Sequence, residues 1–437
     1  MGSAQNRREK TDMTLFGRPP EHGRWILIGL GLCINLALGS IYAWSVFVDP
    51  LAAHFQELGQ PVSASDVLLP FSLFLGAFAL TMPLCGRFID TYGPRPIAFL
   101  GGCLTGSGWL LASVSPSPLY LALSFGAIGG AGVGIAYGVP LTMAARWFPD
   151  RRGTALGLTL LGFGASALLT GFLAGHLISG WGVIATFRVF GVALLILLPL
   201  MGLCLSFPPA GWKPAGWSSS PSLNKTHTSR ECTREEMVRT PAFYGLWICF
   251  FIACSAGLMA ISIALPVGTE VLGLETGLAT FLVSVFAIFN GGGRPLFGAL
   301  TDRLNPQNTA MLSFVLISVA SLLLWQAPVL PIYILSFALL WGSIGAWPAI
   351  APTSTAAFFG LRDYPRCYGV VYLAYGAGAV IGPMLAGSIR TTTGSYIGVF
   401  PYVALFAVIG IGIAFWLMRP PFPGGENGLV TGRDSFQ

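Results

Sequence analysis

The sequence predicts an all-α membrane protein whose twelve transmembrane helices form two six-helix repeats, with both termini in the cytoplasm. Three observations predict this fold class: a scarcity of charge, twelve long apolar runs and an internal repeat. Only 9% of the 437 residues are Asp, Glu, Lys or Arg, and 54% are hydrophobic; the mean hydropathy is +0.73. Because soluble domains carry about 25% charged residues, this composition excludes a soluble enzyme, a disordered scaffold and a nucleic-acid-binding protein.

Apolar runs long enough to cross the membrane as helices, which takes roughly 20 residues for about 30 Å of hydrocarbon, occur twelve times. The first six cover residues 25–48, 66–85, 95–114, 118–146, 153–175 and 186–207. The second six cover residues 241–266, 277–299, 308–326, 329–358, 366–388 and 396–418. The eight Cys residues match neither a disulfide framework nor the spacing of a metal site, so we expect no metal and no other cofactor.

Polar segments divide the chain into five parts. We expect a cytoplasmic N-terminal tail over 1–24, an N-terminal six-helix bundle over 25–207, a cytoplasmic central loop over 208–240, a C-terminal six-helix bundle over 241–418 and a cytoplasmic C-terminal tail over 419–437. The first apolar run is longer than the core of a signal peptide and follows a 24-residue polar tail. We therefore expect it to remain as a transmembrane helix.

The distribution of Lys and Arg predicts the orientation, because positively charged loops are retained in the cytoplasm. The N-terminal tail, the connections after each even-numbered run and the C-terminal tail all carry Arg. The odd-numbered connections carry Asp49, Glu57, Glu270 and Glu275, with only two Arg residues at their margins. The formal net charge of +6 is therefore interpreted as a topology signal, which places the termini in the cytoplasm of a multi-pass protein of the cell membrane.

The two halves of the chain match each other at a constant offset of 212 positions. Residues 83–90 align with residues 295–302, and Gly164-Ala165 aligns with Gly376-Ala377. One offset that serves several helices predicts two halves of the same orientation, related by an axis along the membrane normal. A cavity between two such halves can open to either side when the halves rock.

A motif in the loop after the second helix, repeated after the eighth, resembles the loop signature of the major facilitator superfamily. The residues that carry it are Gly86, Asp90, Gly93 and Arg95 in the first half, and Gly298, Asp302 and Arg303 in the second. An Asp at a helix end can pair with Arg or cap a neighbouring helix and so hold one conformational state. We expect Asp90, Arg95, Asp302 and Arg303 to form such a conformational lock in a major facilitator fold.

Three further segments are similar to the oxalate/formate antiporter family, which is related to the monocarboxylate transporters. They are residues 35–47 in the first helix, residues 137–153 around the fourth and fifth helices, and residues 290–295 in the eighth. The resemblance covers the first eleven helices and implies a carrier of small organic anions. It also implies that Arg294 binds the carboxylate of the substrate.

Arg294 is the strongest single indication of a substrate site in the sequence, because it lies inside an apolar helix eight residues before Asp302. This spacing corresponds to about 12 Å of helical rise from the loop. Burying an Arg in a membrane costs about 2.5–3.5 kcal/mol even on a lenient scale, so such an Arg faces a cavity or a partner. Its repeat mate is the apolar Met82. The alternative to anion binding is an Arg that bonds helix-end carbonyls or extends toward the cytosol.

Asn290 and the tyrosines of the eleventh helix are further candidates for substrate binding. Asn290 lies one turn before Arg294 and could orient the guanidinium, bind substrate or join two helices. Tyr368, Tyr372 and Tyr375 share one helix face, which is also typical of packing. The resemblance places Tyr375 where oxalate exchangers of the family use a Lys as a second cation, and this departure disfavours oxalate as the substrate.

Three residues of the N-terminal half complete the candidate substrate site. Tyr42 lies two turns from Asn35 on one face of the first helix, and Tyr137 precedes Pro140 in the fourth. All three of the polar side chains could hydrogen-bond a small polar ligand. Packing or anchoring at the membrane interface is the alternative role of Tyr42.

The predicted function is secondary transport of a small monocarboxylate such as lactate or pyruvate, coupled to protons, by a monomeric carrier that is not an enzyme. The partners expected are the organic anion, a proton and the lipid bilayer. An oxalate/formate-type anion exchanger is the alternative of the same class. A polytopic membrane enzyme would need a catalytic cluster, which the sequence does not display, and a channel would show conductance in place of saturable countertransport.

Overall fold

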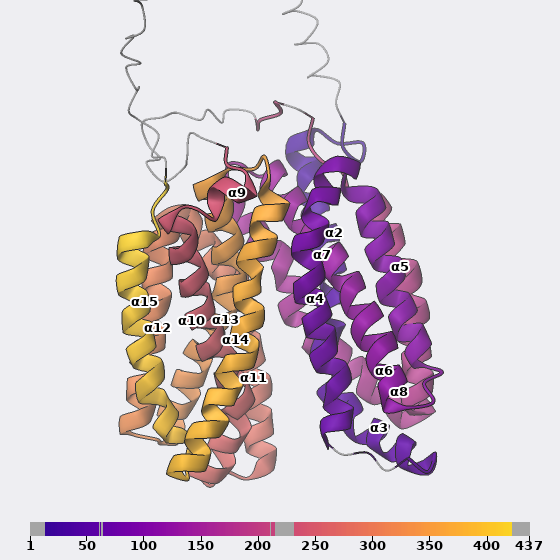
Figure 1. Ribbon diagram of the computed structural model, residues 1–437, viewed down its shortest axis with the longest axis vertical. Helices are drawn as coiled ribbons and strands as arrows, with labels where there is room; N and C mark the ends of the chain where they lie inside the picture. The colour runs from indigo at the N-terminus through magenta and orange to yellow at the C-terminus, as the bar shows by residue number, and fades with distance from the viewer. Residues whose placement is uncertain (1–13, 61, 63, 210, 215–230, 422–437) are drawn as a thin grey trace, which may run out of the picture.

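The computed structural model describes residues 14–421 except 61, 63, 210 and 215–230, and in these residues the chain is helical without β-strands. Helices of the two halves of the chain form two bundles that stand side by side (Figure 1). Most of the two predicted tails and the middle of the predicted central loop lie outside the described residues.

The first bundle, drawn in indigo to magenta in Figure 1, contains the elements before the central loop. They are α2 (Pro20–Leu38), the 3-10 helix η1 (Gly39–Ala43), α3 (Ser45–Glu57), α4 (Ala64–Tyr92), α5 (Pro94–Ala112), α6 (Pro118–Leu121), the π-helix η2 (Ala122–Gly129), α7 (Gly130–Trp147) and α8 (Arg152–Leu203).

The second bundle, drawn in rose to yellow, contains the elements that follow the loop. They are the short α9 (Arg234–Met237), α10 (Pro241–Pro266), the π-helix η3 (Val267–Val271), α11 (Thr276–Leu304), α12 (Pro306–Gln326), α13 (Leu330–Phe359), α14 (Tyr364–Thr393), the 3-10 helix η4 (Tyr396–Val399) and α15 (Phe400–Leu417).

The number of membrane-crossing helices agrees with the prediction. Ten helices in the described residues are apolar and long enough to cross a membrane. One of them, α8, consists of two helices that meet at Gly182, where φ is 80° and ψ is 168°. The 19 residues of α5 add a helix of about 28 Å. Together these make twelve helices, and the fold class of an all-helical membrane protein is confirmed.

The first helix ends earlier than the apolar run of residues 25–48 predicted. The membrane helix stops at the end of η1, and α3 begins a separate helix at Ser45. Phe47, Leu51 and Phe55 are buried in α3 at a spacing of four residues, so this helix has one apolar face, as expected for a helix lying against a bundle. The run of apolar residues therefore spans a boundary between two helices.

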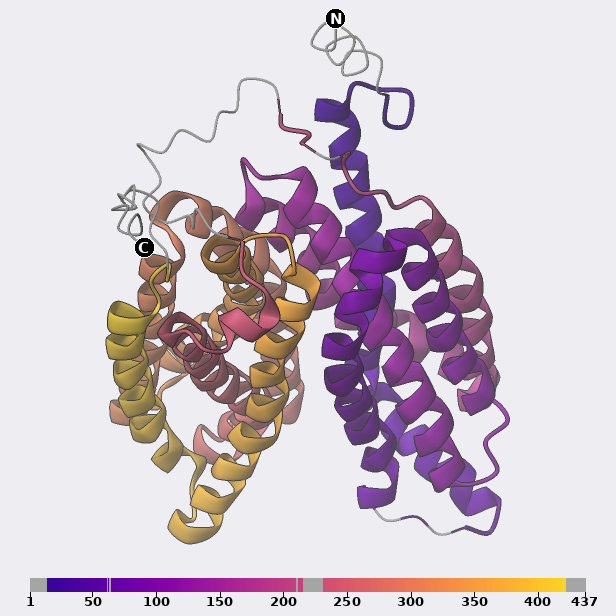
Figure 2. The same cartoon turned by 45° about the horizontal axis from the view of Figure 1, so that its top comes forward.

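The bundles meet most closely at one end of the molecule, which we call the charged end because Arg24, Asp90, Arg146, Asp150 and Asp302 lie there. It is the upper end in Figure 1 and comes forward in Figure 2. Here Gly298 of α11 lies against Gly153 of α8, and Gly86 of α4 lies against Arg366 of α14, so closely that an added Cβ would collide with backbone. Glycine permits these approaches because it has no side chain.

Farther from the charged end, the helices of the two bundles no longer touch at the corresponding positions. An added Cβ at Gly171 or Gly175 of α8 would meet only Val46 of its own bundle, at 3.9 Å, and one at Gly387 of α14 would meet no atom within 4 Å. We call this the opposite end. The bundles thus close against each other at one end and separate toward the other.

Candidate functional site

Arg294 lies between the bundles, where α11 faces α8. Its side chain is only 3% exposed. The Nη1 atom donates a hydrogen bond of 3.0 Å to the carbonyl oxygen of Leu160 in the other bundle, while the buried Nε has no hydrogen-bond partner in the described part of the chain. A buried cationic donor without a partner is costly. An anion that accepts a hydrogen bond from the guanidinium would remove this cost.

Small residues on the neighbouring helix create the space that Arg294 occupies. A Cβ added at Gly164 of α8 would lie 2.6 Å from the Nε atom of Arg294, and one added at Gly157 would collide with the backbone of Arg294 and Pro295. Pro295 also lacks an amide hydrogen, which leaves a carbonyl of α11 without its helical partner. The local sequence therefore brings α11 close to α8 and admits a large charged side chain at the interface.

Tyrosines from both bundles surround this region. The hydroxyl oxygens of Tyr42 and Tyr375 are 2.5 Å apart and form a hydrogen bond between the bundles. Tyr42, Tyr137 and Tyr375 are all close enough to Arg294 to interact with its charge. Hydroxyl groups near a guanidinium can donate to a carboxylate that the guanidinium binds.

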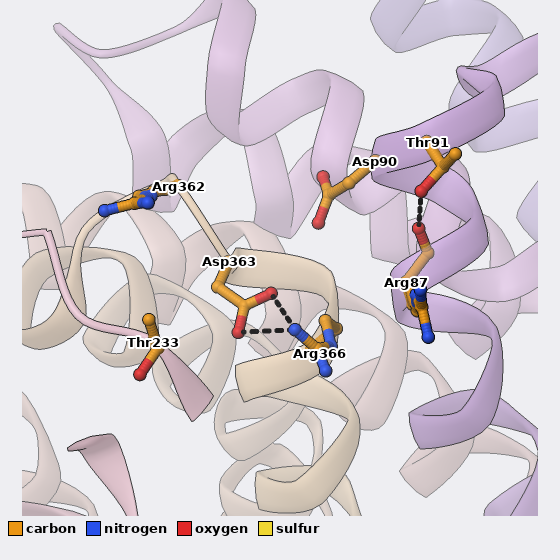
Figure 3. A pocket seen from close by; sticks show the side chains of 7 residues that line it. All are labelled: Arg87, Asp90, Thr91, Thr233, Arg362, Asp363 and Arg366. Atoms are coloured by element: carbon orange, nitrogen blue, oxygen red, sulfur yellow. Dashed lines mark hydrogen bonds and ion pairs between the residues drawn. The ribbon is translucent and has the colours of Figure 1, made fainter. Parts of the chain in front are cut away.

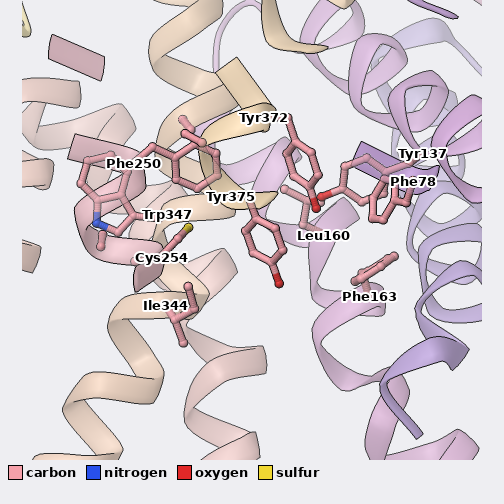
Figure 4. Packing of buried hydrophobic residues seen from close by; sticks show 14 of the residues in the cluster. Phe78, Tyr137, Leu160, Phe163, Phe250, Cys254, Ile344, Trp347, Tyr372 and Tyr375 are labelled. Carbon is pink, nitrogen blue, oxygen red and sulfur yellow. The ribbon is translucent and has the colours of Figure 1, made fainter. Parts of the chain in front are cut away.

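The aromatic rings pack into one cluster that joins the bundles (Figure 4). The ring of Tyr372 lies 5.4 Å from that of Tyr137 and 5.3 Å from that of Phe78, and it stacks on Tyr375 at 5.2 Å. Phe163 of α8 packs edge-on against Tyr42 at 5.1 Å. Of the predicted site residues, Arg294, Tyr42, Tyr137, Tyr372 and Tyr375 are therefore brought together.

The two predicted amide side chains are less closely tied to this cluster. Asn35 is fully buried, and its Nδ2 donates to the carbonyl of Gly31 in its own helix at 2.9 Å. Asn290 is half-buried, and its backbone lies against Gly345 of α13. The buried Oδ1 atoms of both residues have no hydrogen-bond partner in the described residues. Neither amide hydrogen-bonds to Arg294 in this state.

The four predicted lock residues have different contacts. The carboxylate of Asp302 accepts hydrogen bonds from the backbone N–H groups of Gly153 and Thr154, at 2.7 and 2.8 Å, and from the Thr154 hydroxyl at 2.7 Å. It therefore caps α8 of the other bundle. Asp90 instead pairs with Arg146 of its own bundle at 2.6 Å.

The remaining two lock residues make no contact between bundles that the structure displays. Arg95 donates from Nε to the carbonyl of Leu205 at 3.0 Å, which joins α5 to the end of α8 within the first bundle. Arg303 is exposed at the end of α11. Only Asp302, of the four residues, bridges the bundles through a described hydrogen bond.

Further charged residues at the charged end were not singled out by the sequence. Asp363, before α14, accepts from the Arg234 backbone at 2.8 Å and from Arg366 at 3.3 and 3.4 Å. With Asp90 it lines a pocket of about 320 Å³ between the bundles (Figure 3). Arg24 forms a two-pronged ion pair with Asp150, at 2.6 and 2.9 Å.

Only some of these contacts could have been inferred from the sequence. Arg24 belongs to the predicted N-terminal tail and Asp150 to the segment 137–153, but nothing in the sequence pairs the two residues. The carbonyl of Leu160 is a backbone group, and no side-chain pattern could have indicated it. Within the described residues, no group of three or more His, Cys, Asp or Glu side chains is arranged to hold a metal.

The chain is similar to known transporters over most of its length. The model of the Major Facilitator Superfamily matches residues 28–358. The oxalate:formate antiporter of Oxalobacter formigenes is 31% identical over 375 residues, which are 85% of this chain and 86% of that protein. Monocarboxylate transporter 3 of Rattus norvegicus is 27% identical over 440 residues, covering 96% of this chain and 86% of that protein.

Solved structures show the same fold at low sequence identity. The transporter FucP, crystallised in the outward conformation, superposes with a TM-score of 0.68 at 14% identity, over 89% of this chain and 98% of that one. The human organic anion transporter MFSD10 superposes with a TM-score of 0.67 at 15% identity, over 91% and 100%. These relatives are transporters and not enzymes. The chain therefore belongs to the major facilitator superfamily, and its resemblance to the oxalate/formate antiporters and monocarboxylate transporters of that superfamily is confirmed.

Proposed function

We propose that this protein is a secondary transporter of small monocarboxylates that works by alternating access, with Arg294 as the group that binds the substrate carboxylate. The observation that carries the proposal is the state of Arg294, which is 3% exposed, has an unpartnered Nε and forms no ion pair with any described carboxylate. A planar guanidinium offers two parallel donors to a carboxylate. A bound monocarboxylate would neutralise this charge.

The surrounding hydroxyls support one carboxylate better than two. Tyr42, Tyr137 and Tyr375 can each donate a hydrogen bond to an anion at Arg294, but they carry no second positive charge. A dicarboxylate would keep its second charge unpaired in a dry site, at a cost of several kcal/mol. A site with one permanent positive charge therefore favours a monocarboxylate such as lactate, pyruvate or formate over oxalate.

The second candidate is an anion exchanger, which the 31% identity to an oxalate:formate antiporter favours. Substituting Tyr375→Lys would place a second cation beside Arg294. We expect this variant to raise the affinity for oxalate relative to lactate, measured as competition in uptake assays. An unchanged ratio would mean that Tyr375 does not line the substrate site.

Proton coupling follows from the same charge balance. No described carboxylate contacts Arg294, so the transported acid itself is the natural carrier of the proton. Arg294 favours the anionic form on binding, because a cation within about 4–6 Å stabilises a carboxylate, and release then needs a proton or a replacement anion. In net flux the carrier must return empty, with the charge of Arg294 uncompensated. In exchange it returns with a second anion bound. We therefore expect exchange to be faster than net flux.

The proposed orientation places the charged end in the cytoplasm of the cell membrane. A cysteine-free protein with single cysteines at Gln60 or Gly273 should label from outside, whereas one at Ser220, which lies outside the described residues, should label only after permeabilisation. Labelling of Ser220→Cys in intact cells would reverse the orientation.

Transport by purified protein in liposomes tests the function directly. Vesicles are loaded with one unlabelled acid and offered a panel of labelled acids, with and without an inward proton gradient. We expect saturable monocarboxylate uptake that the gradient stimulates. Uptake that is unchanged by a proton ionophore but requires an internal anion would establish an exchanger. Conductance that does not saturate with substrate concentration would establish a channel.

A further inference from the structure

A second feature of the interface between the bundles is an apolar groove between α4 and α14. It has a volume of about 390 Å³ and is lined by side chains that include Phe71, Leu75, Phe78, Tyr372 and Tyr375. Small-molecule sites in proteins have volumes of about 300–1,000 Å³ and are mostly apolar with a few polar groups. The groove alone is therefore larger than a formate or lactate ion requires.

The groove forms because the two helices separate as they leave the charged end. Gly369 of α14 packs against Pro83 of α4 without room for a side chain. Two turns farther along, a Cβ added at Gly376 would still lie 3.3 Å from Ala79, but one added at Gly76 would meet no atom within 4 Å. The space therefore widens toward the opposite end, along one face of α4.

Tyr375 connects this groove to the charged part of the site. Its ring forms part of the groove wall, and its hydroxyl bonds to Tyr42, beside Arg294. Tyr372, which also lines the groove, packs on the ring of Tyr137 at 5.4 Å. A carboxylate held by Arg294 would have the rings of these tyrosines next to the carbon atoms that follow it.

We propose that the groove between α4 and α14 binds the apolar tail of the transported acid, so that the carrier also accepts monocarboxylates with longer tails and binds them more tightly than the small acids named above. This proposal rests on the function proposed above, since the carboxylate must occupy Arg294 for the tail to reach the groove. It assigns Gly76 as a residue that sets the longest tail the carrier accepts, because any side chain there would project into the groove.

The test is a series of 2-oxo acids of increasing chain length, used as competitors of labelled pyruvate exchange in liposomes. Burying one methylene is worth about 0.8 kcal/mol, which corresponds to about a fourfold gain in apparent affinity. The wild type should gain about this factor with each carbon until the groove is full. In Gly76→Leu the gain, measured relative to pyruvate in the same variant, should stop at a shorter chain.

Two further variants keep the test decisive. Gly29→Leu is the matched control, because Gly29 is an exposed helical glycine with no atom within 4 Å of an added Cβ and does not line the groove. It should behave as the wild type does. Gly76→Ala fills less of the groove and should give an intermediate limit, which separates steric filling from misfolding of the Leu variant.

Three results would overturn the proposal. One is an affinity that does not depend on chain length in the wild type. Another is an identical series in the wild type and Gly76→Leu. The third is a groove occupied by a lipid chain, which the exposed rim residues Leu80 and Val380 would permit. Added lipid acyl chains would then compete with long acids. The Gly76→Leu variant would release bound lipid without a change in substrate selectivity. Failure of the proposed function would look different, because no monocarboxylate would be exchanged at all.

Discussion

The contact of α8 with α11 and the contact of α4 with α14 are copies of each other, yet one carries charge and the other is apolar. The offset of 212 positions maps the approach of Gly86 to Pro365 and Arg366 onto the approach of Gly298 to Gly153. In the first contact Met82 is an apolar side chain that is only 3% exposed. In the second, its repeat mate Arg294 reaches across to the Leu160 carbonyl.

The difference between the two lock carboxylates has a covalent cause. Asp302 accepts a hydrogen bond from the amide of Gly153, and the repeat mate of Gly153 is Pro365, which has no amide hydrogen. Asp90 therefore lacks the equivalent of this donor. The amide of Arg366, the repeat mate of Thr154, donates to the carbonyl of Asp363 at 3.1 Å, and Asp90 pairs with Arg146 instead. The repeat thus sets the geometry of both contacts, whereas single substitutions decide which of them bears polar interactions.

The largest expected effect comes from breaking the glycine contact between α8 and α11. Gly298→Val would drive a side chain into the backbone of Gly153, and overpacking of this kind is strongly destabilising. We expect loss of the closed charged end and of most transport. Gly412→Val, at an α15 glycine with no atom within 4 Å of an added Cβ, should transport normally. Equal transport by both variants would show that the contact is not needed.

Removing the α8 cap should have the next largest effect. Asp302→Ala deletes charge-assisted hydrogen bonds between the bundles, and a loss of about 2 kcal/mol corresponds to about a thirtyfold shift toward opening of the charged end. The measurement is the rate of thiol labelling at Tyr364→Cys, a position only 1% exposed in this state, with the eight native cysteines replaced. An unchanged labelling rate would contradict the role of Asp302.

The hydrogen bond between Tyr42 and Tyr375 should contribute less, because it joins two neutral groups. Each single substitution to Phe removes about 1 kcal/mol, or about a fivefold shift. Since both variants lose the same bond, the double variant should shift labelling no more than either one does. Additive shifts would mean that the two hydroxyls act separately.

The smallest effect is expected for Asp90→Ala. This residue pairs with Arg146 within one bundle, and both side chains are partly exposed, at 24% and 22%. Exposed ion pairs are worth about 0–1 kcal/mol, so labelling of Tyr364→Cys should change less than about fivefold. A change as large as that of Asp302→Ala would place Asp90 in the interface after all.

Much of the fold could be predicted from the sequence, because apolar length and repeat spacing are local signals. The break between residues 175 and 186 also corresponds to a real bend, since Gly182 is the residue with positive φ in α8. The boundary at Ser45 was missed because α3 is apolar on one face and continues the hydrophobic run of the first helix. Hydropathy averages over both faces and cannot separate the two helices.

The candidate site was predictable only in part. Arg294 could be found because a charge within an apolar helix is conspicuous, and Tyr375 because its helix carries an aromatic stripe. The bond of Tyr375 to Tyr42 spans 333 positions, and no periodicity within one helix can indicate such a pair. The groove beside Gly76 arises from the divergence of two helices, which is a tertiary property that neither sequence segment encodes alone.

The most direct test of the account is uptake of a labelled monocarboxylate by Arg294 variants in liposomes. Losing a buried, hydrogen-bonded partner of an anion costs about 3 kcal/mol, so Arg294→Ala should lower apparent affinity about a hundredfold or more. Arg294→Lys keeps the charge but loses the two-pronged geometry and should be intermediate. Arg419→Ala, at an exposed position, serves as the control. Wild-type uptake by correctly folded Arg294→Ala protein would contradict the account.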